Sequence, residues 1–172
     1  MERYPGFREF VEARRGALSR TAFFLTGDTS AAEDLLQEAL TKTVARWGNV
    51  TAGGYPEAYV KQVMLNEIRT RWRRRQRRLV VSVADVPDQP HDGDVSDAVD
   101  RTALARALRQ LAPRQRAALY LRYYEDRSYA DIARLLDCSV GTVKSQLHGA
   151  LERLRVIAPE LLADAELSEV LP

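Results

Sequence analysis

A stretch of twenty residues near the middle of the chain, 81–100, constrains the fold most strongly. It carries six aspartates and no lysine or arginine, with Pro87, Pro90 and Gly93 among them. A segment of this kind cannot bury enough apolar surface to offset the entropy of ordering, so it predicts a flexible linker. The 172 residues are therefore expected to form two small modules, each with its own core. We place the modules at 4–78 and 97–157, the acidic linker at 79–96 and a C-terminal tail at 158–172.

The composition argues against catalytic and metal-dependent functions. One cysteine, Cys138, and two histidines, His91 and His148, leave few candidates for a disulfide, a metal site or a catalytic triad. No glycine-rich phosphate loop is present either, so we expect a binding protein with no catalytic residue, metal or cofactor. No apolar run approaches the ~20 residues of a membrane-spanning helix, and the N-terminus lacks the apolar core of a secretion signal. We expect a cytoplasmic protein without membrane insertion.

The spacing of apolar residues predicts an all-α fold. In the first module, apolar residues recur at helical intervals over 7–25, 36–47 and 59–68, and no alternating strand pattern occurs. Pro56 suits the first turn of the third helix. Residues 48–56, which include two consecutive glycines, are expected to form a loop before it.

Basic residues are concentrated at the end of the first module. Residues 69–78 contain seven arginines in ten positions. Upstream of and within this run, one side of the predicted third helix carries polar and basic residues within about 60° of one another, opposite the apolar side. Arginine binds phosphates and stacks on bases, while asparagine and glutamine hydrogen-bond base edges, so this side predicts a nucleic-acid surface. Complementation of a helix dipole, the alternative, needs far fewer than seven arginines. The residues of this side are Gln62, Asn66, Arg69 and Arg73.

The second module has the sequence anatomy of a helix-turn-helix. Ser128 and Ser139 each precede an apolar-periodic segment and are predicted to cap a short and a longer helix. Residues 137–139 form the turn between them. In this motif the start of the second helix enters the major groove of DNA, whereas a plain helical hairpin is the alternative. Polar side chains predicted to point outward there are Lys144, Ser145 and His148.

Seven short motifs occur in a fixed order across both modules. They are LTGD at 25–28, AEDLLQEAL at 32–40, YV at 59–60, WRRR at 72–75, LAPRQR at 111–116, LRYYED at 121–126 and GTVKS at 141–145. In these motifs the chain closely resembles the group-4, or extracytoplasmic-function, sigma factors of bacterial RNA polymerase, in particular an actinobacterial SigE-like subfamily. The resemblance covers about 150 residues and implies an all-α fold of two domains, sigma region 2 and sigma region 4.

The resemblance implies a polymerase-binding helix and a promoter-opening helix in region 2. By match to the AEDLLQ motif, the second helix is expected to dock on the clamp helices of the polymerase β′ subunit through Asp34, Leu35, Gln37 and Glu38. The third helix is expected to bind the −10 promoter element, with residues 48–55 forming a pocket for a flipped base. The −10 residues implied are Gln62, Asn66, Arg69, Arg73 and Arg74.

Region 4 is implied to read the −35 element and to touch the flap of the polymerase β subunit. An anti-sigma factor is a further partner that the family suggests. Two positions depart from the family. Asp137 stands in the turn in place of the usual glycine, and aspartate tolerates left-handed geometry better than most residues; Gly149 stands where an arginine is common, which removes an expected DNA contact. The −35 residues implied are Arg114, Arg116, Thr142, Lys144, Ser145 and His148.

Two other functions fit parts of the same sequence. A stand-alone helix-turn-helix regulator would bind duplex DNA through the second module, but it leaves the AEDLLQ motif and the arginine run unexplained. A decoy that binds an anti-sigma factor would use region 2 without starting transcription. In a sigma factor the acidic segment, of about 22 residues from 79 to 100, reaches at most about 75 Å when extended. Its aspartates are expected to compete with DNA or to line a positive channel of the polymerase.

Overall fold

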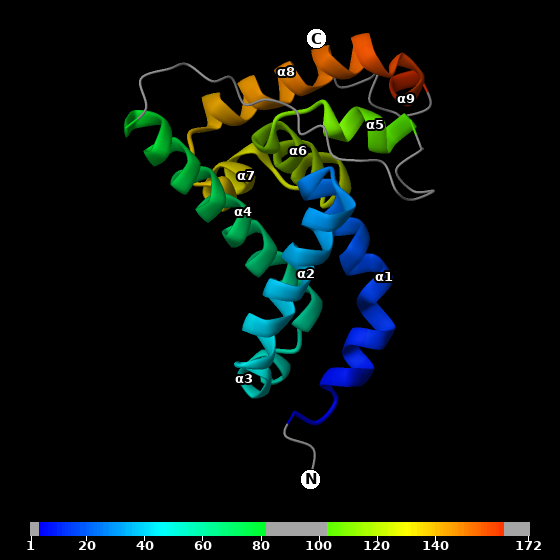
Figure 1. Cartoon of the computed structure of the whole chain (residues 1–172), viewed down its shortest axis with the longest axis vertical. Coiled ribbons are helices and arrows are strands. Elements are labelled where there is room, and N and C mark those ends of the chain that lie inside the picture. Colours follow the sequence, from blue (N-terminus) through cyan, green and yellow to red (C-terminus); the bar gives the residue numbers. More distant parts are fainter. Residues whose placement is uncertain (1–3, 82–102, 164–172) are drawn as a thin grey trace. The chain divides into compact units, whose positions relative to one another are not determined.

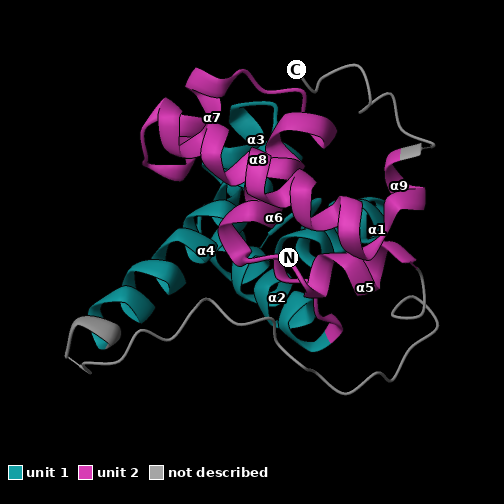
Figure 2. Ribbon diagram, turned by 90° about the horizontal axis from the view of Figure 1, so that it is seen from above, with its two compact units in different colours: residues 1–25, 30–85 teal, residues 26–29, 86–172 magenta. Residues whose placement is uncertain are grey.

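The computed structural model describes residues 4–81 and 103–163, and every regular element within these ranges is a helix (Figure 1). The chain divides into two compact units, residues 1–25 with 30–85 and residues 26–29 with 86–172 (Figure 2). The all-α prediction is confirmed. Most of the predicted acidic linker and the end of the tail lie outside the described residues.

Three long helices build the core of the first unit. They are α1 (Phe7–Thr26), α2 (Thr29–Val44) and α4 (Pro56–Val81), with the short α3 (Trp47–Ala52) between the last two. Each long helix buries one apolar stripe at intervals of three or four residues, as an amphipathic helix must. Side chains with 0 % exposure include Leu18, Leu25, Leu35, Ala39, Val60 and Met64. Helix α4 runs three residues past the predicted module boundary at 78.

Trp47 explains why the segment before Pro56 is not a simple loop. Its ring is 5 % exposed and lies 5.0 Å from the ring of Phe7 and 5.2 Å from that of Phe10. Its indole Nε1 donates a hydrogen bond of 2.8 Å to the backbone oxygen of Pro5. The prediction of a loop over 48–56 is therefore wrong for the residues of α3. This short helix has little propensity of its own and depends on its anchored tryptophan.

The second unit contains α5 (Ala103–Arg109), α6 (Pro113–Leu119), a π-helical turn (Tyr120–Tyr124), α7 (Tyr129–Leu136), α8 (Val140–Ile157) and α9 (Pro159–Ala163). Helix α8 packs against α6, α7 and α9. Leu111, Ile132 and Val143 are among the fully buried side chains of the second unit.

The turn between α7 and α8 follows the predicted helix-turn-helix chemistry. Ser128 Oγ accepts a hydrogen bond of 3.1 Å from the Asp131 amide, and Ser139 Oγ accepts one of 3.0 Å from the Thr142 amide. Asp137 closes α7 with φ +54°, in the left-handed region. Both predicted caps are confirmed, and Asp137 adopts the conformation that glycine usually supplies. No helix in the described part of the chain is long and apolar enough to span a membrane.

Candidate nucleic-acid and protein interfaces

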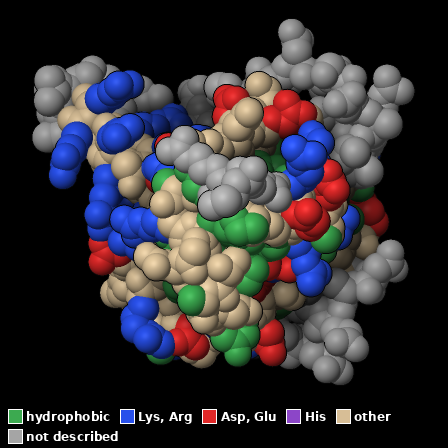
Figure 3. Space-filling model, turned by 90° about the horizontal axis from the view of Figure 1, so that it is seen from below, with side chains coloured by type: hydrophobic (Ala, Val, Ile, Leu, Met, Phe, Trp, Pro, Cys, Tyr) green, Lys and Arg blue, Asp and Glu red, His purple; other side chains and the backbone are tan. Residues whose placement is uncertain are grey.

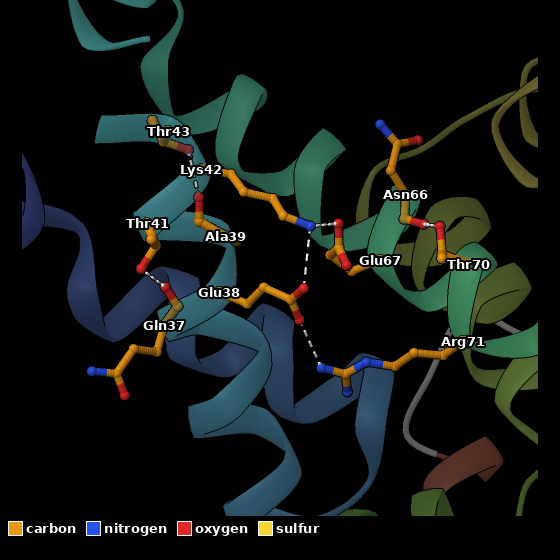
Figure 4. A network of polar contacts seen from close by, with 10 residues as sticks. All are labelled: Gln37, Glu38, Ala39, Thr41, Lys42, Thr43, Asn66, Glu67, Thr70 and Arg71. Carbon is orange, nitrogen blue, oxygen red and sulfur yellow. Dashed lines mark hydrogen bonds and ion pairs between the residues drawn. The ribbon is translucent and has the colours of Figure 1, made fainter. Parts of the chain in front are cut away.

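The exposed side of α2 presents only part of the predicted polymerase-binding set. Asp34 and Gln37 are exposed, and Figure 4 shows the Gln37 side chain pointing away from α4. Leu35 is 0 % exposed, since it follows Ala32 and precedes Ala39 on the buried stripe of the helix. The prediction that Leu35 supplies apolar interface area is wrong: its side chain belongs to the core.

Glu38 lies at the edge of this exposed side and joins α2 to α4 (Figure 4). Its Oε1 is 3.1 Å from Lys42 Nζ, and its Oε2 is 3.2 Å from Arg71 Nη2. Lys42 also forms an ion pair with Glu67 of α4. The pKa of Glu38 lies below its ordinary value of 4.5, chiefly through a hydrogen bond with the Glu67 carboxyl and then through Lys42 and Arg71. These four residues, Glu38, Lys42, Glu67 and Arg71, are called the α2–α4 ion network below.

One side of α4 carries a connected row of polar groups. Asn66 Oδ1 accepts hydrogen bonds of 3.3 Å from Gln62 Nε2 and from Arg69 Nη1. Arg73 and Arg74 follow one turn later and are exposed. The structure thus brings Gln62, Asn66 and Arg69 together, with their donors preorganised along the helix.

From residue 69 to residue 78, no side chain of α4 is fully buried. This segment of the helix, residues 69–78, is the arginine arm. Ten residues of α-helix measure about 15 Å. Figure 3 shows Lys and Arg side chains gathered over this arm at the upper left of the view. Positive charge on an exposed helix of this kind suits a phosphate backbone.

A pocket lies between α3 and the start of α4. Its volume is about 420 Å³, within the range of pockets that hold small organic molecules. Gly54, with φ +80°, allows the sharp turn that closes this side of the unit before Pro56. Tyr55 is 78 % exposed at the pocket. The lining residues are Arg46, Asn49, Val50, Gly53, Tyr55, Ala58 and Tyr59.

In the second unit, the polar side chains exposed on the first half of α8 are Lys144, Ser145 and His148, while Thr142 is half-buried. The Thr142 hydroxyl lies 2.9 Å from that of Ser139, so it belongs to the cap of the helix. The first turns of α8 therefore offer donors and acceptors from a helix whose N-terminus is locked in place.

Arg116 does not reach the surface. Its side chain is 7 % exposed, and Nη1 donates hydrogen bonds of 3.1 Å and 2.7 Å to the backbone oxygens of Leu108 and Leu111. The Leu108 carbonyl lies in the last turn of α5 and the Leu111 carbonyl in the connection to α6, so this guanidinium ties the end of α5 to the segment that follows it. The prediction that Arg116 contacts DNA phosphate is wrong, whereas Arg114 is half-buried and retains some exposed surface.

Comparison with known proteins decides the family. Family models of Sigma-70 region 2 and Sigma-70, region 4 match residues 10–78 and 101–154. The RNA polymerase sigma-E factor of Streptomyces coelicolor is 40 % identical over 161 residues, which are 92 % of this chain and 90 % of that relative. The chain belongs to the extracytoplasmic-function sigma factors.

Other relatives of this sigma factor agree. The ECF RNA polymerase sigma factor SigL of Mycobacterium tuberculosis is 35 % identical over 158 residues, 90 % of this chain and 89 % of the relative. Among solved structures, the sigma factor RpoE of Bartonella quintana in complex with the anti-sigma factor NepR matches with a TM-score of 0.57 and 28 % identity. That match covers 92 % of this chain and 98 % of the other.

Sequence reasoning missed one group of side chains in region 4 of this sigma factor. The Arg122 guanidinium carbon lies 5.1 Å from the centre of the Tyr129 ring, and Lys144 Nζ lies 5.8 Å from the same centre. The π-helical turn, α7 and α8 each contribute one member, so two cations converge on one aromatic ring beside the exposed start of α8. The LRYYED motif signals this place in the sequence, but its spacing does not reveal the convergence.

Proposed function

We propose that this sigma factor binds its partners through separate surfaces. The exposed side of α2 binds core RNA polymerase, α4 with its pocket binds the −10 element, and the start of α8 binds the −35 element. The observation that carries this proposal is the connected row of Gln62, Asn66 and Arg69 leading into the arginine arm. The protein acts by reversible binding in the cytoplasm and catalyses nothing itself. No covalent chemistry is required, because opening a promoter is a matter of binding its separated strands.

The polymerase contact is assigned to Asp34, Gln37 and Glu38. Asp34 and Gln37 are exposed on α2, and the Glu38 side chain is 40 % exposed at the rim of the same surface. An acidic helix face of this kind complements a basic helical surface on the β′ clamp. Leu35 takes no part in the contact, because it is buried.

The −10 element is assigned to α4 and the pocket. The polar row supplies groups that hydrogen-bond base edges, and the arginine arm, with Arg73 and Arg74, supplies phosphate contacts. An unstacked base entering the pocket would find Tyr55 and Tyr59 for stacking and Asn49 for hydrogen bonds to its edge. Capture of such a base stabilises the melted strand.

The −35 element is assigned to Lys144, Ser145 and His148, with the Thr142 cap holding the helix in register. Arg114 is assigned to the phosphates in place of the buried Arg116. The cations around Tyr129 lie beside the same helix start, so Arg122 joins Lys144 as a phosphate contact. We assign the β flap and an anti-sigma factor as further partners of the chain, the latter in parallel with the RpoE–NepR complex.

Run-off transcription with purified core RNA polymerase on a library of promoters tests the proposal. We expect transcripts only when the protein is added, from promoters that share a −35 and a −10 element. Asp34→Lys should weaken polymerase binding at least tenfold by placing like charges together, with duplex DNA affinity unreduced. A protein that neither binds core enzyme nor yields transcripts would overturn the proposal, and capture of an anti-sigma factor without transcription would identify a decoy.

A further inference from the structure

A single carboxylate, Glu38, joins the proposed polymerase side of α2 to the start of the arginine arm on α4. Its two oxygens bind different cations: Oε1 lies 3.1 Å from Lys42 and Oε2 lies 3.2 Å from Arg71 (Figure 4). Lys42 and Glu38 are neighbours on α2, whereas Arg71 reaches Glu38 from 33 positions further along the chain. The contact with Arg71 is therefore the ion pair that this carboxylate forms between the two helices.

The two cations do not depend on Glu38 to the same degree. Lys42 has a second carboxylate, Glu67, and would keep it if Glu38 were engaged elsewhere. Within residues 4–81 and 103–163, the ion pair of Arg71 is formed with Glu38 alone. Removing Glu38 from the α2–α4 ion network thus leaves Lys42 paired and sets Arg71 free.

The pair is accessible and weak enough to exchange. The side chains of Arg71 and Glu38 are 41 % and 40 % exposed, so a cation from a docking protein can reach Glu38. Ion pairs at this exposure are screened by water and contribute little to stability. A more strongly held cation at a protein interface competes with them.

Arg71 also occupies a defined place on the arginine arm. Arg74 and Arg78 follow it at intervals of three and seven residues, which puts all three on one side of the helix. This side differs from that of the polar row. Arg74 and Arg78 are exposed, so a released Arg71 would extend their row by one cation toward the core of the unit.

We propose that Glu38 and Arg71 form an exchangeable ion pair through which polymerase binding strengthens DNA binding. A polymerase cation that takes Glu38 frees Arg71, and Arg71 then binds a DNA phosphate beside Arg74. This inference rests on the proposed function for its two partners. Because linkage is reciprocal, DNA bound at Arg71 favours polymerase at Glu38 by the same factor.

The test measures DNA affinity of the full-length protein without polymerase. The probe is a fluorescein-labelled DNA duplex of mixed sequence, titrated by anisotropy at several KCl concentrations, because phosphate contacts are independent of sequence. Glu38→Gln releases Arg71 and is compared with Glu57→Gln as a matched control. Glu57 pairs with Lys61 on α4 and with Arg14 on α1, so its loss changes the net charge equally and also breaks a contact between helices.

We expect Glu38→Gln to tighten duplex binding about threefold more than Glu57→Gln, the scale of one exposed ion pair. The slope of log affinity against log salt should steepen by about 0.9, one phosphate. When Arg71→Gln is added to each variant, the difference in duplex affinity between them should disappear. Equal effects of Glu38→Gln and Glu57→Gln, or a gain that persists with Arg71→Gln, would overturn the inference.

Two controls keep the outcome interpretable. Circular dichroism checks that each variant retains its helices. If Glu38→Gln does not, Glu38→Asp, which moves the carboxylate one methylene away from Arg71, replaces it with Glu57→Asp as its matched control. Binding of the unaltered protein to core polymerase is measured separately. Its failure would refute the proposed function, whereas normal polymerase binding with equal DNA affinities would refute the exchange alone.

Discussion

The two units of this sigma factor hold their proposed binding residues in different ways. In the second unit, the start of α8 is set by contacts between residues three apart, such as Ser139 with Thr142. In the first unit, Glu38 of α2 is held by Arg71 and α3 is anchored by a bond from Trp47 to Pro5, across 33 and 42 positions of the chain. Region 4 is thus positioned by local caps and region 2 by tertiary contacts. The difference predicts which substitutions alter folding and which alter binding.

The largest loss of stability is expected at Trp47, which makes several contacts with residues distant in the sequence. Trp47→Ala removes the rings' contact with Phe7 and Phe10 and the bond to Pro5, and should destabilise the first unit by about 3–5 kcal/mol. Urea unfolding followed by circular dichroism measures this loss. The half-buried Trp72 is the control, and Trp72→Ala should cost less than half as much. Equal losses would show that α3 is not anchored through Trp47.

Arg116→Ala tests whether an arginine of region 4 acts in folding or in binding. It leaves the Leu108 and Leu111 carbonyls without their guanidinium donor, so we expect a loss of about 2–3 kcal/mol in unfolding free energy. Arg122→Ala should instead reduce the salt slope of DNA binding by about 0.9, with little loss of stability. If Arg116→Ala reduced the salt slope of DNA binding under conditions where the variant is folded, Arg116 would be a DNA phosphate contact after all.

Removing the Ser139 cap of α8 tests how far local contacts stabilise the second unit. Ser139→Ala deletes the acceptor of the Thr142 amide and should destabilise the second unit by about 1 kcal/mol. Ser139→Asp, which retains an acceptor, should recover most of the loss in thermal unfolding. A loss of 3 kcal/mol or more, well above the ~1 kcal/mol of a typical cap, would mean that the turn depends on more than its cap.

The smallest effect is expected from the pH dependence of the α2–α4 ion network. Since the pKa of Glu38 is lower in the folded protein, its ionisation stabilises the fold above pH 4.5, and this contribution disappears as the pH falls through the folded value. The pKa of Lys42 is raised above 10.5 by hydrogen bonds to Glu67 and then Glu38, so its contribution is lost only at strongly alkaline pH. The stabilities of the unaltered protein and of Glu38→Gln, measured by urea unfolding, should therefore differ at pH 7, and the difference should shrink as the pH falls below 4.5. A difference that persists in acid would contradict the assignment.

Local patterns in the sequence were sufficient for several features. The helical periodicity, both serine caps and the turn at Asp137 depend on residues within four positions of one another, and the structure confirms them. The ordered motifs, read as a family resemblance, indicated the sigma factor family that the relatives show. These features share one physical basis, which is hydrogen bonding and burial repeated at the period of a helix.

Packing between distant segments decided the rest. Leu35 and Arg116 stand beside polar residues in their motifs, yet one is in the core and the other binds backbone carbonyls. Helix α3 and the pocket beside it depend on where Trp47 packs, and the α2–α4 ion network depends on how two helices face each other. The spacing of apolar residues along a helix predicts which side of it is buried, but it does not predict which distant residue contacts that side. For this protein, the sequence alone determined the long helices, the helix-turn-helix and the family, whereas tertiary contacts decided α3 and selected which polar side chains remain available to bind.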